Sequence, residues 1–379
     1  GQGSDIVQST DNGTTLNSRI SFTGSHELPN TGTKAGFEIT FEPTSGLNGS
    51  SAFGSSQAPL SANGQGNGFV VPSVSGNQGF DENNAFGANV GLLASNLWLS
   101  GGWGKLTMGT QGMPTDNIAV LEDPSVTLWT NVAPVFRGGN FTIQGLKGAA
   151  AGTQQYAHFL QCLGIVGGIG IDCNGIYRNG VRYDLPTIAG IDIAVGYAND
   201  DIYDIAAKYK TSLGGLNAQL AVGYSINQGA VAGADQPTFA GRSVIGTEAE
   251  TFQMAVGLMD PSTGIFGSFS YQHEDADGGT ATVAVGDDTD AYYTKVGIKR
   301  AFNSLGDTSI HFAYGSYNDQ FGNNNAVAGV TGSEVERIAF GVTQYFGAAF
   351  QIYGNWEQLD FDVDCSTAAC STAYDGAEE

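Results

Sequence analysis

The chain has 379 residues, of which 57 are glycine and 41% are hydrophobic, and its net charge at neutral pH is −23. A charge of this sign disfavours nucleic acid and anionic membrane surfaces as partners; it suits cationic solutes and divalent cations better, or simply keeps the chain soluble. No apolar run reaches the roughly 18 residues of a membrane-spanning helix, whereas a mean hydropathy of −0.09 fits a barrel that alternates lipid-facing and polar residues.

Apolar and polar residues alternate along nearly the whole chain, which is the period of a β-strand. The predicted strands cover residues 15–24, 34–42, 89–100, 105–111, 178–185, 191–198, 204–210, 216–224, 251–259, 265–273, 292–299, 308–315, 337–345 and 350–356. The flanking residues 1–13 and 357–379 are predicted as loops. A barrel of 16 strands needs one more strand at each end, so either those strands lie outside this sequence or the barrel has about 14.

The connections alternate in length. Every second one is a tight turn, whereas most of the others are long and polar: residues 45–88, 112–176, 225–248, 274–290 and 316–336. Short turns on one rim and long loops on the other are typical of an outer-membrane barrel. The fold class predicted is therefore all-β, a transmembrane antiparallel β-barrel.

One face of each predicted strand is apolar. Leu220 and Val222 share a face in one strand, and Ile193 and Val195 share a face in another. The opposite faces carry Arg, Lys, Asn, Gln, Thr and Gly, which cannot form a large dry core. We therefore expect the apolar faces to meet lipid and the polar faces to surround a water-filled lumen, with tyrosines near the strand ends at the membrane interfaces.

The longest connection between two clear strands, residues 112–176, has no periodicity and is predicted to fold into the lumen and narrow it. Alternation places six scarce cations on the inward faces: Arg19, Lys105, Arg178, Arg182, Lys208 and Lys210. The long loop offers the carboxylates Asp116, Glu122 and Asp123 opposite them. Wall cations facing loop carboxylates would set up a transverse field that favours small polar solutes. The alternative is that these are ordinary solvated charges.

Four cysteines form two close pairs, Cys162 with Cys173 and Cys365 with Cys370. They lack a zinc pattern, so we expect two local disulfides in an oxidising compartment, with four free thiols as the alternative.

The acidic stretch around Asp275, Asp277 and Asp287 suggests a surface Ca²⁺ site, although it lacks the spacing of an EF-hand. Neither a nucleophile elbow nor a phosphate-binding or metalloprotease motif is found. The sequence is therefore predicted not to encode an enzyme, and Ca²⁺ in the acidic loops is the only cofactor considered.

Three blocks carry a family resemblance: GKLTMGTQ (104–111), RNGVRYDLPTIAGIDIAVGYA (178–198) and AAKYKTSLGGLNAQLAVGYS (206–225). The chain resembles the trimeric general-diffusion porins of Gram-negative bacteria, in particular the alphaproteobacterial branch. The resemblance implies one outer-membrane barrel domain over residues 1–379, 16 strands, a homotrimer, and a third loop that folds into the lumen.

The resemblance also assigns roles to residues. Arg178, Arg182 and Arg19 would belong to a basic wall cluster, and Asp116, Glu122 and Asp123 would form the acidic side. Outer-membrane lipid and lipopolysaccharide would surround the barrel, and small hydrophilic solutes and ions would diffuse through it. Two alternatives remain open: a substrate-selective channel, and a surface structural or adhesion barrel that binds calcium through its acidic loops.

Overall fold

The computed structural model describes most of the predicted barrel and part of the long loop. The described residues are 20–43, 90–120, 123–127, 143, 145–150, 154, 156–160, 177–198, 201–228, 248–277, 288–321, 329–347 and 350–375.

Fourteen strands are present among the described residues, with short helical segments between and after them. The strands are β1 (Ile20–Leu28), β2 (Thr33–Pro43), β3 (Val90–Gly101), β4 (Gly104–Gly112), β5 (Tyr177–Asp184), β6 (Ile191–Ala198), β7 (Ile202–Leu213), β8 (Leu216–Asn227), β9 (Glu248–Met259), β10 (Ile265–Asp277), β11 (Asp288–Asn303), β12 (Gly306–Asn318), β13 (Val330–Phe346) and β14 (Phe350–Cys365). The helical segments are η2 (Gly148–Ala150), η3 (Tyr156–Phe159) and α3 (Ala368–Tyr374).

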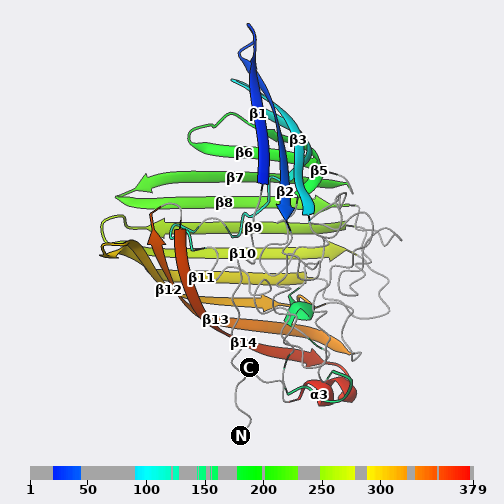
Figure 1. Ribbon diagram of the computed structural model, residues 1–379. Coiled ribbons are helices and arrows are strands. Elements are labelled where there is room, and N and C mark those ends of the chain that lie inside the picture. Colours follow the sequence, from blue (N-terminus) through cyan, green and yellow to red (C-terminus); the bar gives the residue numbers. More distant parts are fainter. Residues whose placement is uncertain are drawn as a thin grey trace.

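The strands form a single curved sheet in sequence order, from β1 at one end to β14 at the other (Figure 1). Each strand pairs antiparallel with the next one along the chain. Within the described residues β1 and β14 are the two edges of this sheet. The predicted antiparallel all-β architecture is confirmed.

Among the described residues, no helix is long and apolar enough to cross a membrane.

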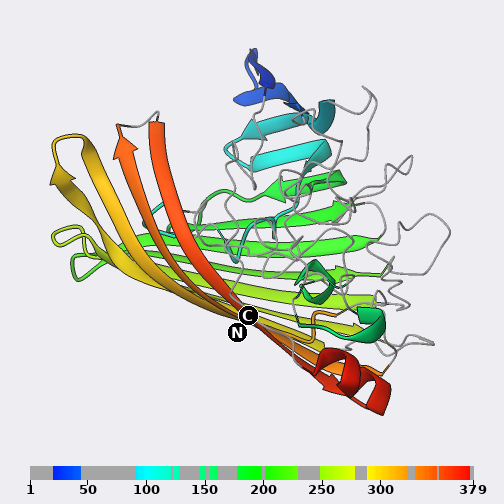
Figure 2. The same ribbon diagram turned by 60° about the horizontal axis from the view of Figure 1, so that its bottom comes forward.

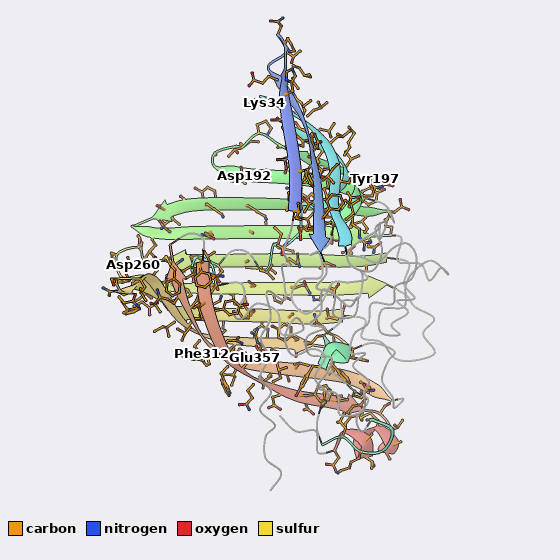
Figure 3. The ribbon with its side chains drawn as sticks, in the orientation of Figure 1. Lys34, Asp192, Tyr197, Asp260, Phe312 and Glu357 are labelled. Carbon is orange, nitrogen blue, oxygen red and sulfur yellow. A yellow bond between two sulfur atoms is a disulfide. The ribbon has the colours of Figure 1, made fainter. Side chains whose placement is uncertain are left out.

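The two rims of the sheet differ as predicted. Figure 3 labels Lys34, Asp192 and Asp260, which lie at or beside the short turns of the sheet, and Tyr197, which lies at the opposite end of β6 (Figure 3). The β9–β10 turn is capped by Asp260, whose Oδ1 accepts hydrogen bonds from the Ser262 backbone N–H at 2.8 Å and from Ser262 Oγ at 2.7 Å. These hydrogen bonds, with one from Thr263, lower the pKa of Asp260 to about 2.

Apolar side chains face outward from the sheet, as predicted. The exposed fractions are 41% for Leu220, 42% for Val222 and 38% for Val195. On the inner face Gln253 and Gln272 are fully buried and hydrogen-bonded to each other at 2.7 Å. This outer surface would be costly in water and suits lipid.

The C-terminal part of the chain differs from the prediction. Residues 357–379 were expected to form a loop, but β14 continues to Cys365 and is followed by α3. In this part of β14 the buried apolar residues Leu359 and Phe361 face inward, and the exposed Asp360 and Asp362 face outward. The polarity is thus the reverse of that in residues 350–356 of the same strand, where the apolar side chains face outward.

The expectation of a water-filled lumen is wrong for one sector. The inner faces of β11–β14 carry apolar residues that pack against the long loop, and the buried members of this core include Ala291, Tyr293, Ala313, Tyr317, Val335, Ala339, Leu359, Phe361, Ile143, Leu146, Phe159 and Leu160. We call this cluster the apolar plug. The small alanines on these inner faces leave space that the loop fills with its own apolar side chains.

Candidate functional site

The loop between β4 and β5, residues 113–176, is the inward loop of the molecule. It begins on the inner wall, where the Arg182 guanidinium of β5 donates hydrogen bonds to the carbonyl oxygens of Gly112 at 3.2 Å and Met113 at 3.4 Å. The same guanidinium bonds Asp184 Oδ1 through Nη2 at 2.7 Å and through Nε at 3.0 Å. Asp184 therefore orients Arg182, and Arg182 holds the first residues of the loop against β5.

A second contact ties the loop to β7. Asp204 Oδ2 accepts hydrogen bonds from the Thr115 backbone N–H at 2.9 Å and from Thr115 Oγ1 at 2.8 Å. The wall has a glycine at this point, Gly196, and no larger residue would fit without displacing its neighbours. A Cβ there would lie 2.3 Å from Asp204 Oδ1 and 2.8 Å from Pro114 Cδ. The loop therefore lies directly on the backbone of the wall.

The loop then reaches β11. Lys295 Nζ of β11 lies 2.5 Å from Asp123 Oδ2 and 2.9 Å from Thr127 Oγ1, and the Lys295 side chain is fully buried. Ser125 donates two more hydrogen bonds to Asp123, at 2.9 Å from its backbone N–H and 2.7 Å from its hydroxyl. Burial alone would raise the pKa of the Asp123 carboxyl, but the charge of Lys295 and these hydrogen bonds outweigh it and lower that pKa below 3.8.

The tip of this segment is fixed to β11 and β13. Lys299 Nζ donates to the Ser125 carbonyl at 3.0 Å, and the Tyr345 hydroxyl donates to the carbonyls of Ser125 at 3.0 Å and Val126 at 2.9 Å. Val126 has a φ of +58°, a conformation that is strained for a β-branched residue. Strain of this kind persists only where the surroundings impose it, and here the hydrogen bonds from Tyr345 do so.

The second half of the loop packs against β14 and α3. The Phe159 ring lies 4.4 Å from the Phe361 ring and 6.2 Å from the Tyr374 ring, between centroids. The Tyr156 hydroxyl donates to the Leu359 carbonyl at 3.4 Å. The inward loop is thus attached to the wall at β5, β7, β11, β13 and β14, and in this way it crosses the interior of the curved sheet.

The predicted basic residues fall into different environments. Arg182 holds the start of the loop, and Arg178, four residues away on the same face, is buried. Lys105 lies at the short-turn end of β4 with its ammonium 5.3 Å from the centroid of the Trp98 ring. On β7, Lys208 is half-buried and Lys210 is exposed. Arg19 lies outside the described residues.

The predicted acidic residues are also separated. Asp116 Oδ1 accepts a hydrogen bond from Asn117 Nδ2 at 2.5 Å. Asp123 does face a wall cation, but that cation is Lys295, which was not predicted, and the pair is buried. Asp123 therefore anchors the loop. Glu122 lies outside the described residues, and the role of these residues in a constriction stays a prediction.

Three cations on the inner wall, two of which anchor the loop, escaped the sequence analysis. Lys295 and Lys299 are four residues apart on β11, a spacing that places both side chains on the same face of the strand. Arg337 of β13 is buried and pairs with Glu357 of β14 at 2.9 Å. The burial of these residues could not be read from the sequence, because it depends on the path of the loop.

Cys365 and Cys370 form a disulfide that joins the end of β14 to α3, as predicted. Cys162 and Cys173 lie outside the described residues. Asp275 stands opposite Asp288 in the β10–β11 register, and the side chain of Asp277 and all of Asp287 lie outside the described part. Among the described residues, no group of three His, Cys, Asp or Glu side chains is arranged to hold a metal ion.

An antiparallel curved sheet that is apolar outside, with a loop tied across its interior, defines a membrane pore of the β-barrel class. The chain belongs to the Gram-negative porin family, whose sequence model matches residues 2–364. It is accordingly an outer-membrane diffusion channel. No curated protein matches the chain in sequence.

Several solved structures resemble the chain at low identity. The anion-selective porin from Comamonas acidovorans is 18% identical with a TM-score of 0.48, and the match covers 92% of this chain and 81% of that one. A loop-deletion mutant of OmpT from Vibrio cholerae is 11% identical with a TM-score of 0.49, covering 92% and 86%. OmpF of Salmonella typhi in complex with daunomycin is 12% identical with a TM-score of 0.48, covering 90% and 83%. The family assignment rests on the sequence match.

Proposed function

We propose that small hydrophilic solutes and ions diffuse passively through this channel along the side of the interior that the apolar plug leaves open. The observation that carries the proposal is the contrast between two sectors of the inner wall. In front of β11–β14 the wall carries the apolar plug, which the loop covers. In β1 the face that continues inward carries the exposed polar residues Ser21, Thr23 and Ser25, and half-buried Glu38 of β2 continues this polar face.

The proposed passage runs beside the start of the inward loop. The register carries the polar face from Glu38 of β2 to Asn96 of β3 and on towards Arg182 of β5. Lys105, Arg178, Arg182 and Lys208 would form its basic side and Asp116 the nearest carboxylate of the loop. A transverse field between them orders water and disfavours apolar solutes.

The purified protein in a planar lipid bilayer tests this proposal. We expect stepwise, ohmic increases in current in the bilayer. In a separate assay, vesicles that contain the protein should swell in small sugars but not in large oligosaccharides. The Arg178→Gln variant should shift the reversal potential toward cations without changing the size limit. Protein that is folded in the bilayer, as judged by its β-sheet circular dichroism, and yet carries no current would overturn the proposal. Micromolar block by one sugar or phosphate would favour a substrate-selective channel instead.

We further propose that the channel is a homotrimer that contacts outer-membrane lipid and lipopolysaccharide through its apolar outer face. OmpT of Vibrio cholerae is described in a trimer form, and it is among the structures that resemble this chain. The support within this chain is the continuous exposed apolar surface of the sheet. Native mass spectrometry from detergent should give three times the chain mass. A monomer at all concentrations would contradict the proposal.

A second candidate function is surface attachment through Ca²⁺ bound at the long-loop rim. Asp275 and Asp288 stand directly opposite each other across two strands, where like charges repel and a bound cation would reduce the repulsion. Calorimetric titration with Ca²⁺ should show binding that the Asp275→Asn variant weakens. The absence of binding at millimolar Ca²⁺ would remove this candidate. We also propose that the protein is not an enzyme.

A further inference from the structure

We propose that α3 and the Cys365–Cys370 disulfide form a clamp that positions the second half of the inward loop, so that reduction of this disulfide makes the channel fluctuate. The inference rests on the proposed diffusion function, because it concerns the mobility of the loop that crosses the pore. The residues of the clamp come from β14, from α3 and from the middle of the loop. Figure 2 shows α3 beside the end of β14 (Figure 2).

The clamp holds the loop through backbone and side-chain contacts. The Lys147 backbone N–H donates to the Ala373 carbonyl at 2.8 Å, and Lys147 Nζ lies 3.0 Å from Asp375 Oδ2. Both charges of this ion pair are exposed, so the pair itself contributes little. The backbone hydrogen bond and the buried ring of Tyr374 against Phe159 are the stronger attachments.

α3 depends on the disulfide for its position. The helix has seven residues, and a helix this short is not stable by itself in water. Its N-cap Thr367 accepts a hydrogen bond from the Cys370 backbone N–H at 3.2 Å, and Cys370 is fully buried. The disulfide links Cys370 back to Cys365, the last residue of β14, across a separation of five residues. Without this bond the helix would be held by the chain that leads into it and by non-covalent contacts such as the packing of Tyr374 on Phe361, whose ring centroids lie 6.2 Å apart.

The consequence for the channel follows from where the clamped segment lies. Phe159 and Leu146 are buried members of the apolar plug, and the Phe159 ring contacts Phe361 of the inner wall on one side and Tyr374 of α3 on the other. When α3 leaves, this segment of the loop loses one of its two supports, while the anchors at Asp123 and Arg182 remain. We therefore expect brief changes of current as the segment moves, with the mean conductance largely kept.

Reduction of the assembled channel tests the clamp, and the second cysteine pair supplies a matched control. In the Cys162→Ser/Cys173→Ser variant only Cys365–Cys370 can be reduced. Addition of tris(carboxyethyl)phosphine to this variant in a bilayer should raise the rate of brief current fluctuations about tenfold. The Cys365→Ser/Cys370→Ser variant should fluctuate at that rate before any reductant is added. Tyr374→Ala should behave likewise, whereas Thr372→Ala, on the exposed side of the same helix, should not.

Two outcomes separate the clamp from the function on which it rests. A channel that conducts steadily after reduction, with both thiols shown to be free by alkylation and mass measurement, would overturn the clamp and leave the diffusion function intact. Protein that never conducts would overturn the diffusion function itself. The reductant acts on protein that is already folded in the membrane. A change of current on reduction therefore cannot be caused by a folding defect.

Discussion

Asp123 of the inward loop and Lys295 of β11 form an ion pair with a distance of 2.5 Å between Oδ2 and Nζ, in which 7% and 0% of the two side chains are exposed. The loop leaves the wall at β4 and reaches β11 at this pair, so the pair fixes the far end of a segment that spans the interior. A buried pair of this kind is weak evidence for net stabilisation, but removing one partner leaves the other charge buried without a counter-ion.

We expect the Lys295→Met variant to lower the free energy of unfolding by about 3–5 kcal/mol, because the Asp123 carboxylate would stay buried without its cation. The Asp123→Asn/Lys295→Met double variant should lose less, since it buries no charge. Urea unfolding in lipid vesicles measures both. Lys210→Met, at an exposed position of β7, is the matched control and should change stability little. A single variant as stable as the parent would show that the pair does not fix the loop.

The same pair predicts a dependence on acid pH. The pKa of Asp123 is lower in the folded protein than its usual value of 3.8, so its stabilising effect is complete above pH 3.8. That effect is lost as the pH falls through the folded pKa, which lies below 3.8. Current noise that arises from loss of this pair should therefore rise as the pH falls below about 4. Asp260 stays charged to about pH 2, so its turn does not contribute in this window.

The Asp123→Asn variant is the control for the pH experiment. It should be noisy at pH 7 already and should show no further rise near pH 3 to 4. A parent channel that becomes noisy at pH 5 or 6 would show that another group limits the loop.

The glycine wall under the start of the loop gives a third prediction. In Gly196→Ala the new Cβ would displace the Asp204 carboxylate, which holds Thr115, and would press on Pro114. Overpacking of this kind costs about 1–3 kcal/mol, and we expect the loop start to move off the wall and the conductance to fall. Gly354→Ala is the matched control, because a Cβ there meets no atom within 4 Å. Equal behaviour of the two variants in bilayer recordings and urea unfolding would contradict this explanation.

The order and faces of the strands could be predicted from the sequence because alternation at positions such as Leu220 and Val222 is a local property. The anchors could not, since Asp123 and Lys295 are 172 residues apart and no spacing links them. The apolar plug was missed for a related reason. Ala313 and Tyr317 on an inner face read as ordinary strand residues until the loop supplies Phe159 and Leu160 to cover that face.

The outward face of β8 gives a fourth prediction, in which neighbouring residues are compared. Leu220→Arg would place a charge against lipid and should cost about 2–4 kcal/mol if the residue lies near the middle of the bilayer. Gln219→Arg, one residue earlier and on the inner face, should cost much less and should shift ion selectivity toward anions. Unfolding free energies in vesicles decide the order. A reversed order would mean that the sheet is turned inside out.

Ala313 of β12 and Ser25 of β1 test the proposed off-centre passage, because they lie in the two sectors that it distinguishes. Ala313 is 2% exposed within the apolar plug, whereas Ser25 is exposed on a polar face. Both residues are small, so a cysteine at either site disturbs packing little. A charged, water-soluble methanethiosulfonate should react quickly with Ser25→Cys and reduce the current. It should leave Ala313→Cys unmodified, because water does not reach the plug. Each variant is best made with Cys162 and Cys173 replaced by serine, so that only the introduced thiol and the Cys365–Cys370 disulfide remain. Rapid modification of Ala313→Cys would place the water path in front of β11–β14 and would refute an off-centre passage.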